Sequence, residues 1–156
     1  MSLLSRTKTL MAAGTAALGL TAGIAVLAPA AQAAPLTIGQ RAVVLAAAQH
    51  GKPYIYGAAG PRGFDCSGLV AYVYRQLGKP LPHNAAAQYR NSKHIPVAAL
   101  RPGDLVFMNM DGASPAGIDH VGIYAGNGNW WVARHSGTTI TLQHIWTNKV
   151  WAARVA

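Results

Sequence analysis

The single cysteine of this chain stands at the start of a helical pattern, directly after a loop rich in glycine and proline. The loop covers residues 57–63. The apolar residues that follow Cys66 recur at three- and four-residue spacing, which is typical of a helix. Asp65 occupies the position of an N-cap, and Gly78 ends the pattern. The sequence therefore predicts that Cys66 lies in the first turn of a helix.

The first turn of a helix is a favourable place for a thiolate. Unpaired N–H groups and the positive end of the helix dipole stabilise negative charge there, so we expect them to favour the thiolate of Cys66 over the thiol. A lone cysteine can also be a small, buried hydrophobic residue. Because a loop delivers Cys66 to a helix end rather than to the middle of an element, we interpret it as a nucleophile.

The first 33 residues have the composition of a secretory signal peptide. Arg6 and Lys8 form a basic start, residues 10–30 are rich in alanine and aliphatic side chains, and residues 31–33 form a small-x-small cleavage signature. The alternative is a membrane anchor, since the apolar run is long. We expect cleavage after Ala33, which leaves no stable membrane anchor. Residues 34–156 then form one secreted domain with a modest core.

The charge of residues 34–156 favours an anionic partner. This segment carries 11 lysines and arginines and 4 acidic residues, a net charge of +7. The cations are scattered singly, which together with secretion argues against nucleic acid. Anionic polymers of a bacterial envelope fit better, and solubility alone is the other explanation. No histidine pair has the spacing of a zinc site, so we expect no metal. We also expect no cofactor and a monomer.

The two halves of the chain differ in their hydrophobic period. Helices are predicted over about 38–50, from Cys66 onward and over 85–90, the first opened by the capping-box pair Thr37 and Gln40. After Leu100 the pattern predicts strands, with a hairpin turn at 126–128, over residues 104–108, 120–125, 130–134, 138–142 and 150–154. This order is typical of an α+β fold, with N-terminal helices packed on an antiparallel sheet of five to six strands.

A thiol nucleophile needs a base, and residues 34–156 contain six histidines. His120 differs from the others because it opens a predicted strand directly after a loop, where its side chain can face a helix end. An imidazole there can take the thiol proton and later return it to a leaving amine. Surface or capping positions are expected for His50, His83, His94 and His144.

Four segments, in this order, resemble the successive motifs of the NlpC/P60 family: residues 53–57 (Pro-Tyr-Ile-Tyr-Gly), 63–70 (Gly-Phe-Asp-Cys-Ser-Gly-Leu-Val), 100–107 (Leu-Arg-Pro-Gly-Asp-Leu-Val-Phe) and 120–128, which opens with His-Val-Gly-Ile-Tyr. The resemblance covers about residues 38–156. It implies a papain-like core and a secreted cysteine peptidase that acts on the peptides of bacterial peptidoglycan. The bond implied is commonly the one between γ-D-glutamyl and a diamino acid.

The resemblance also implies roles for individual residues. Cys66 would be the nucleophile and His120 the base. Tyr54 would donate a hydrogen bond near the developing oxyanion, together with the Cys66 N–H group. Asp65 and Ser67 would line the site and hold the stem peptide. Two simpler explanations stay open, because Asp65 could serve only as a helix cap and Tyr54 only as a core aromatic.

The chain departs from the family pattern at the third member of the site. The family usually has a polar residue, often histidine, twelve positions after the base, and here that position is Val132. His135 is the nearest polar candidate, but it needs a β-bulge to reach the same face of the strand. A backbone carbonyl, a water or Gln143 could orient His120 instead, and an impaired site is the remaining alternative.

Taken together, the sequence predicts a secreted, cell-wall-associated cysteine endopeptidase that acts through an acyl-thioester of Cys66. Two alternatives stay open. An amidase or acyltransferase could use the same pair of residues on another acyl bond. A wall-binding module with a disabled site is the other, and Val132 is the residue that favours it.

Overall fold

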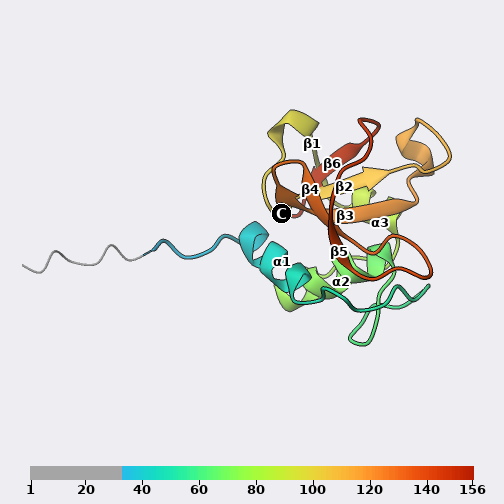
Figure 1. Ribbon diagram of the computed structural model, residues 1–156. Helices are drawn as coiled ribbons and strands as arrows, with labels where there is room; N and C mark the ends of the chain where they lie inside the picture. The colour runs from blue at the N-terminus through green and yellow to red at the C-terminus, as the bar shows by residue number, and fades with distance from the viewer. Residues whose placement is uncertain (1–32) are drawn as a thin grey trace, which may run out of the picture. The chain divides into compact units, whose positions relative to one another are not determined.

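The computed structural model describes residues 33–156 (Figure 1). The predicted signal peptide therefore lies outside the described residues, except for Ala33. Residues 34–156 form one compact unit. None of the helices within residues 33–156 is both long and apolar enough to cross a membrane.

Each of the three helices begins at a side chain that caps it. The helices are α1 (Ile38–Ala47), α2 (Cys66–Gln76) and α3 (Ala85–Arg90). Thr37 forms a capping box at α1, Asp65 caps α2, and Asn84 caps α3. The predicted helix starts are confirmed. The first helix ends before the predicted His50, because residues 48–51 continue as a turn.

Six strands form one antiparallel sheet in the order β1-β6-β2-β3-β4-β5. The strands are β1 (Lys93–Ile95), β2 (Leu105–Met108), β3 (His120–Gly126), β4 (Asn129–Val132), β5 (Thr141–His144) and β6 (Trp151–Arg154). The α+β fold and the predicted number of strands are confirmed. Asn127 and Gly128 join β3 to β4 with φ angles of 53° and 73°, which fit the predicted hairpin turn. The sequence did not predict β1, which has only three residues and no alternation.

Both faces of the sheet are apolar, and the helices cover one of them (Figure 1). We call this face the helix side; on it Val121 and Ile123 of β3 belong to the same core cluster as Leu69 of α2. On the opposite face, the far side, Trp130 and Val132 of β4 belong to a second cluster, whose other members are Val106, Met108, Leu100, Tyr124, Ile145 and Val150. Because side chains alternate along a strand, consecutive residues of β3 point in turn to the helix side and to the far side.

Polar contacts tie the segment just before β2 to α2 and to β6. The hydroxyl group of Tyr74 on α2 donates a hydrogen bond to the carbonyl of Gly103, just before β2. Asp104, which is 3% exposed, accepts two hydrogen bonds of 2.7 Å from the guanidinium of Arg154 on β6. The first turn of α2 lies beside the start of β3, where the sulfur of Cys66 contacts the carbonyl of Asp119 and where the candidate site lies.

Candidate active site

Cys66 lies in the first turn of α2 and faces a pocket. Its side chain is partly exposed, and the thiol donates a hydrogen bond to the carbonyl of Asp119, with a distance of 3.8 Å between sulfur and oxygen. The pocket has a volume of about 440 Å³, and the sequence-predicted residues Tyr54, Asp65 and Ser67 line it together with Cys66. The sulfur is therefore accessible rather than sealed in the core.

Backbone pairing brings Tyr54 to the same pocket. The N–H group of Phe64 donates to the carbonyl of Pro53, and the N–H group of Ile55 donates to the carbonyl of Phe64, so residues 53–55 run beside the segment that leads into α2. Burial raises the pKa of Tyr54, and the negative charges that Cys66 and Asp65 can carry raise it further. The hydroxyl group thus stays protonated and can donate a hydrogen bond.

Asp65 is occupied by donors from the protein itself. Its carboxylate accepts hydrogen bonds from the N–H groups of Gly57 (2.9 Å) and Gly68 (2.7 Å), from the hydroxyl group of Ser67 (3.2 Å) and from Nε2 of His83 (2.8 Å). Asp65 is 8% exposed. The structure therefore shows the capping function that the sequence left as the simpler explanation, and it shows that this residue also ties the preceding loop to α2.

Two polar residues of the site escaped the sequence analysis. His83 was expected only in a loop or capping position, but it lines the pocket and contacts Asp65. Gln88 of α3 is fully buried and donates hydrogen bonds to the carbonyls of Ser67 (2.8 Å) and Pro82 (2.7 Å), which holds the His83 loop against α2. Both contacts join different elements, so no local pattern in the sequence could have revealed them.

His120 lies at the first residue of β3, where the sulfur of Cys66 meets that strand. The sulfur contacts the carbonyl of Asp119 and accepts a hydrogen bond from the N–H group of Val121. The sulfur therefore touches the backbone on both sides of His120. The thiol donates to that carbonyl and not to the imidazole. His120 itself is 5% exposed and has Met108 as its cross-strand neighbour. The structure thus places the sulfur of Cys66 beside the backbone that flanks His120, while the imidazole packs against Trp130 and Trp146 on the far side of the sheet. That the two side chains act as nucleophile and base stays a prediction.

No polar side chain among the described residues reaches Nε2 of His120. This atom is buried and has no hydrogen-bond partner within residues 33–156. Val132 is fully buried in the apolar cluster of the far side. His135 lies beyond the end of β4, is exposed, and its Nδ1 atom contacts the carbonyl of Ser136 at 2.8 Å. The irregular pairing of β3 with β4 lies at residues 124–126, away from His135. Orientation of His120 by His135 therefore stays a prediction, and Gln143 instead donates to the hydroxyl group of Thr141.

Burial makes both members of the pair neutral. It raises the pKa of Cys66 to about 11, the charge of Asp65 adds to this, and the backbone N–H groups of Ser67 and Val121 oppose it only in part. Burial also lowers the pKa of His120 to about 4, with Asp119 opposing this shift and Arg134 adding to it. The pKa of Cys66 thus disfavours the thiolate that the sequence predicted at the helix end, because the cost of burying the charge exceeds the effect of the N–H groups. The site thus holds a neutral thiol on α2 and an unprotonated imidazole at the start of β3, and an unprotonated imidazole can act as a general base.

The described residues offer no obvious metal site. Within residues 33–156, no three side chains of histidine, cysteine, aspartate or glutamate lie close enough together to hold a metal ion.

The buried imidazole should make the stability of the protein depend on pH. Because the pKa of His120 is about 4 in the folded protein and ordinarily 6.5, the unfolded chain binds the proton more tightly. The contribution of His120 to the free energy of unfolding is complete above its ordinary pKa and is lost as the pH falls through its pKa in the folded protein. This contribution amounts to about 3 kcal/mol. Denaturant unfolding of the wild type and of His120→Gln should show that the wild type loses about this much more stability on acidification. Equal losses would contradict a buried neutral imidazole.

A protein-family model and several curated proteins match this chain. The model described as the NlpC/P60 family matches residues 51–155. The "Probable endopeptidase p60" of Listeria grayi is 48% identical over 94 residues, which are 60% of this chain and 18% of that protein. The "Murein DD-endopeptidase MepH" of Escherichia coli is 43% identical over 101 residues, which are 62% of this chain and 36% of that protein. The chain thus spans less than half the length of both relatives.

Solved structures agree with this match. NlpC2 of Trichomonas vaginalis superposes with a TM-score of 0.71 at 28% identity, over 80% of this chain and 48% of that one. The peptidoglycan hydrolase RipB of Mycobacterium tuberculosis superposes with a TM-score of 0.66 at 29% identity, over 76% and 64% of the two chains. These neighbours confirm the predicted papain-like core. Since the family match covers more than half of its length, this chain belongs to the NlpC/P60 family.

Proposed function

We propose that this chain is a cysteine peptidase that hydrolyses the peptides of bacterial peptidoglycan, with Cys66 as the nucleophile and His120 as the base. One observation carries the proposal: the sulfur of Cys66 lines a pocket and also contacts the backbone at the start of β3, where His120 lies. Relatives named as endopeptidases and a structural neighbour named a peptidoglycan hydrolase support the type of reaction and the substrate.

The reaction begins from a neutral pair. As the sulfur of Cys66 attacks the carbonyl carbon, the imidazole of His120 takes the thiol proton and a C–S bond forms. The N–H group of Cys66 and the hydroxyl group of Tyr54 donate hydrogen bonds to the oxyanion. The C–N bond then breaks, the imidazolium returns its proton to the leaving amine, and a thioester remains on Cys66. His120 next removes a proton from water as the water oxygen attacks the thioester carbon. The C–S bond then breaks, the new carboxylic acid leaves and ionises, and the imidazolium returns its proton to the sulfur of Cys66.

Within peptidoglycan, the proposed target is the bond between γ-D-glutamyl and a diamino acid, which the family resemblance implies. The name of the Escherichia coli relative specifies a DD-endopeptidase instead, and that of the Listeria relative specifies no bond. Mass spectrometry of the products separates these possibilities. A diamino acid with a newly freed amino group and a γ-D-glutamyl carboxylate supports the proposal, whereas products with intact γ-D-glutamyl bonds contradict it. A freed lactyl group on muramic acid would show an amidase.

The proposed location is outside the cell, at the wall, with the enzyme as a monomer. The signal-peptide composition of residues 1–33 and the positive charge of residues 34–156 support this.

The positive charge should hold the enzyme at anionic wall polymers. We expect binding of the protein to purified walls to weaken as the salt concentration rises, because salt screens exposed charges. Binding assays with the inactive Cys66→Ala variant measure this without digestion of the walls. Binding that salt does not change would contradict retention by charge.

The competing function is a wall-binding module with a disabled site. The observation that favours it is the buried Nε2 atom of His120, which has no partner among the described residues, with Val132 at the position usual for a polar residue. A base without a hydrogen-bonded partner can nevertheless retain much of its activity, because the third member of such sites often contributes least. Activity of the pair therefore decides between the two functions.

Substitution of either member of the pair should abolish or greatly reduce clearing of purified walls. Cys66→Ala removes the nucleophile, so we expect no clearing. His120→Ala removes the base and should lower the rate by about 10²–10⁴-fold. The matched control is His94→Ala, because His94 is exposed on β1 and stacks on Tyr89 away from the site. Turbidity measurements give the rates. If Cys66→Ala clears walls as fast as the wild type, the proposed enzyme is wrong and the binding module is favoured.

A further inference from the structure

The imidazole of His120 is in contact with two indole rings on the far side of the sheet. Its ring centroid lies 5.6 Å from that of Trp130, with an interplanar angle of 83°, and 6.2 Å from that of Trp146, with an angle of 43°. The two indoles also contact each other, with centroids 5.2 Å apart. These distances are in the range of favourable contacts between aromatic rings. His120 is therefore surrounded by aromatic rings at the place where the family pattern would put a polar partner.

The backbone of β3 is built to accept Trp130. A Cβ atom at Gly122, two residues after His120, would lie 2.5 Å from an atom of the indole, so a larger residue would displace the ring. Trp130 is fully buried, and its indole N–H group has no hydrogen-bond partner within the described residues. This indole is part of the core cluster of the far side, so its loss would disturb the fold as well as the site.

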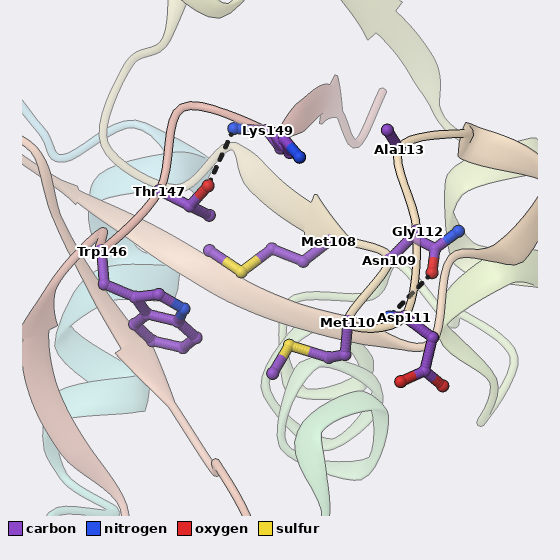
Figure 2. A pocket seen from close by; sticks show the side chains of 9 residues that line it. All are labelled: Met108, Asn109, Met110, Asp111, Gly112, Ala113, Trp146, Thr147 and Lys149. Carbon is purple, nitrogen blue, oxygen red and sulfur yellow. Dashed lines mark hydrogen bonds between the residues drawn. The ribbon is translucent and has the colours of Figure 1, made fainter.

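Trp146 is different, because it covers the imidazole of His120 from outside the sheet. It belongs to the segment that follows β5, and it is 39% exposed. Figure 2 shows its indole at the wall of a second pocket, with the side chains of Met108 and Met110 nearby. The guanidinium of Arg134 lies 4.4 Å from the centroid of the same indole, a cation–π contact that helps to hold the ring. Trp146 thus contacts the imidazole and also reaches solvent.

We propose that Trp146 is the positioning residue for His120, and that its indole does by packing what a hydrogen-bonding third residue would otherwise do. The inference rests on the proposed function, in which His120 is the base. Three observations support it. Trp146 contacts the ring of His120, Nε2 of His120 has no hydrogen-bond partner within residues 33–156, and Val132 is buried. An imidazole held in this way has fewer orientations to lose when the thiol proton is transferred.

Exclusion of water by the indole also accounts for the state of the base. The groups that act on the charge of His120 are Asp119, which favours the imidazolium, and Arg134 and His135, which disfavour it; Cys66 approaches from α2 as a neutral thiol. Burial is the largest effect and keeps the imidazole unprotonated. Removal of Trp146 would admit water to the ring and weaken this effect.

The first test is the titration of His120, followed by NMR of its ring protons in a Cys66→Ala background. We expect Trp146→Ala to raise the pKa of His120 from about 4 toward the ordinary 6.5, by about 1–2 pH units, and Trp146→Phe to raise it less, because phenylalanine keeps an aromatic cover. The matched control is Leu142→Ala, which removes another large, 49% exposed side chain, on β5. The proposal is overturned if His120 titrates with the same midpoint in Trp146→Ala, Trp146→Phe and the wild type. Trp146→Phe keeps the test valid if the alanine variant does not fold.

The second test separates positioning from substrate binding, since Trp146 also lines the pocket in Figure 2. With the cysteine intact and a soluble stem peptide as substrate, Trp146→Ala should lower kcat about tenfold or more and change KM little, because the base is misplaced. A raised KM with unchanged kcat overturns the proposal and makes Trp146 a substrate contact. If Cys66→Ala clears walls as fast as the wild type, only the proposed function is refuted. The titration of His120 still tests whether Trp146 shields the imidazole.

Discussion

The site depends on the contact between the first turn of α2 and the start of β3. Asp65 fixes the helix end by accepting hydrogen bonds from four donors, on Gly57, Ser67, Gly68 and His83. This sets the position of the Cys66 sulfur against the backbone that flanks His120. Because α2 and β3 pack on the same core cluster, the fold itself fixes where Cys66 and the backbone of His120 lie.

The same contact explains why the pair is neutral. The helix end and the backbone N–H groups of Cys66, Ser67 and Val121 stabilise a thiolate, but the sulfur lies where burial penalises any charge, and the neighbouring Asp65 adds to the penalty. The imidazole faces a comparable penalty on the other side of the strand, where indole rings cover it. A neutral thiol and a neutral imidazole are the least costly state of such a site. In the proposed mechanism the proton therefore moves during the attack on the substrate and not before it.

The sequence predicted those parts of the structure that local chemistry determines. Thr37, Asp65 and Asn84 mark helix starts because each side chain accepts a hydrogen bond from an N–H group three residues later. The turn at Asn127-Gly128 was predictable because few residues adopt positive φ. The motifs, through their family resemblance, indicated Cys66 and His120 before any geometry was known.

Contacts between distant elements were not predictable in this way. The pairing of His83 with Asp65 joins residues 18 positions apart in different elements, and the contact of Trp146 with His120 joins the segment after β5 to β3. Neither leaves a periodic pattern. The pKa of Cys66 was expected to fall because the helix end was visible in the sequence, whereas the burial that outweighs it became visible only in the fold.

The most direct test of this account is the state of the sulfur, measured as the ultraviolet absorbance of the thiolate during a pH titration. Subtraction of the Cys66→Ala titration removes the contribution of the tyrosines. A buried neutral pair predicts no thiolate signal at neutral pH and a midpoint near 11. A thiolate already present at neutral pH, and lost when His120 is replaced by alanine, would show a preformed ion pair and contradict the account.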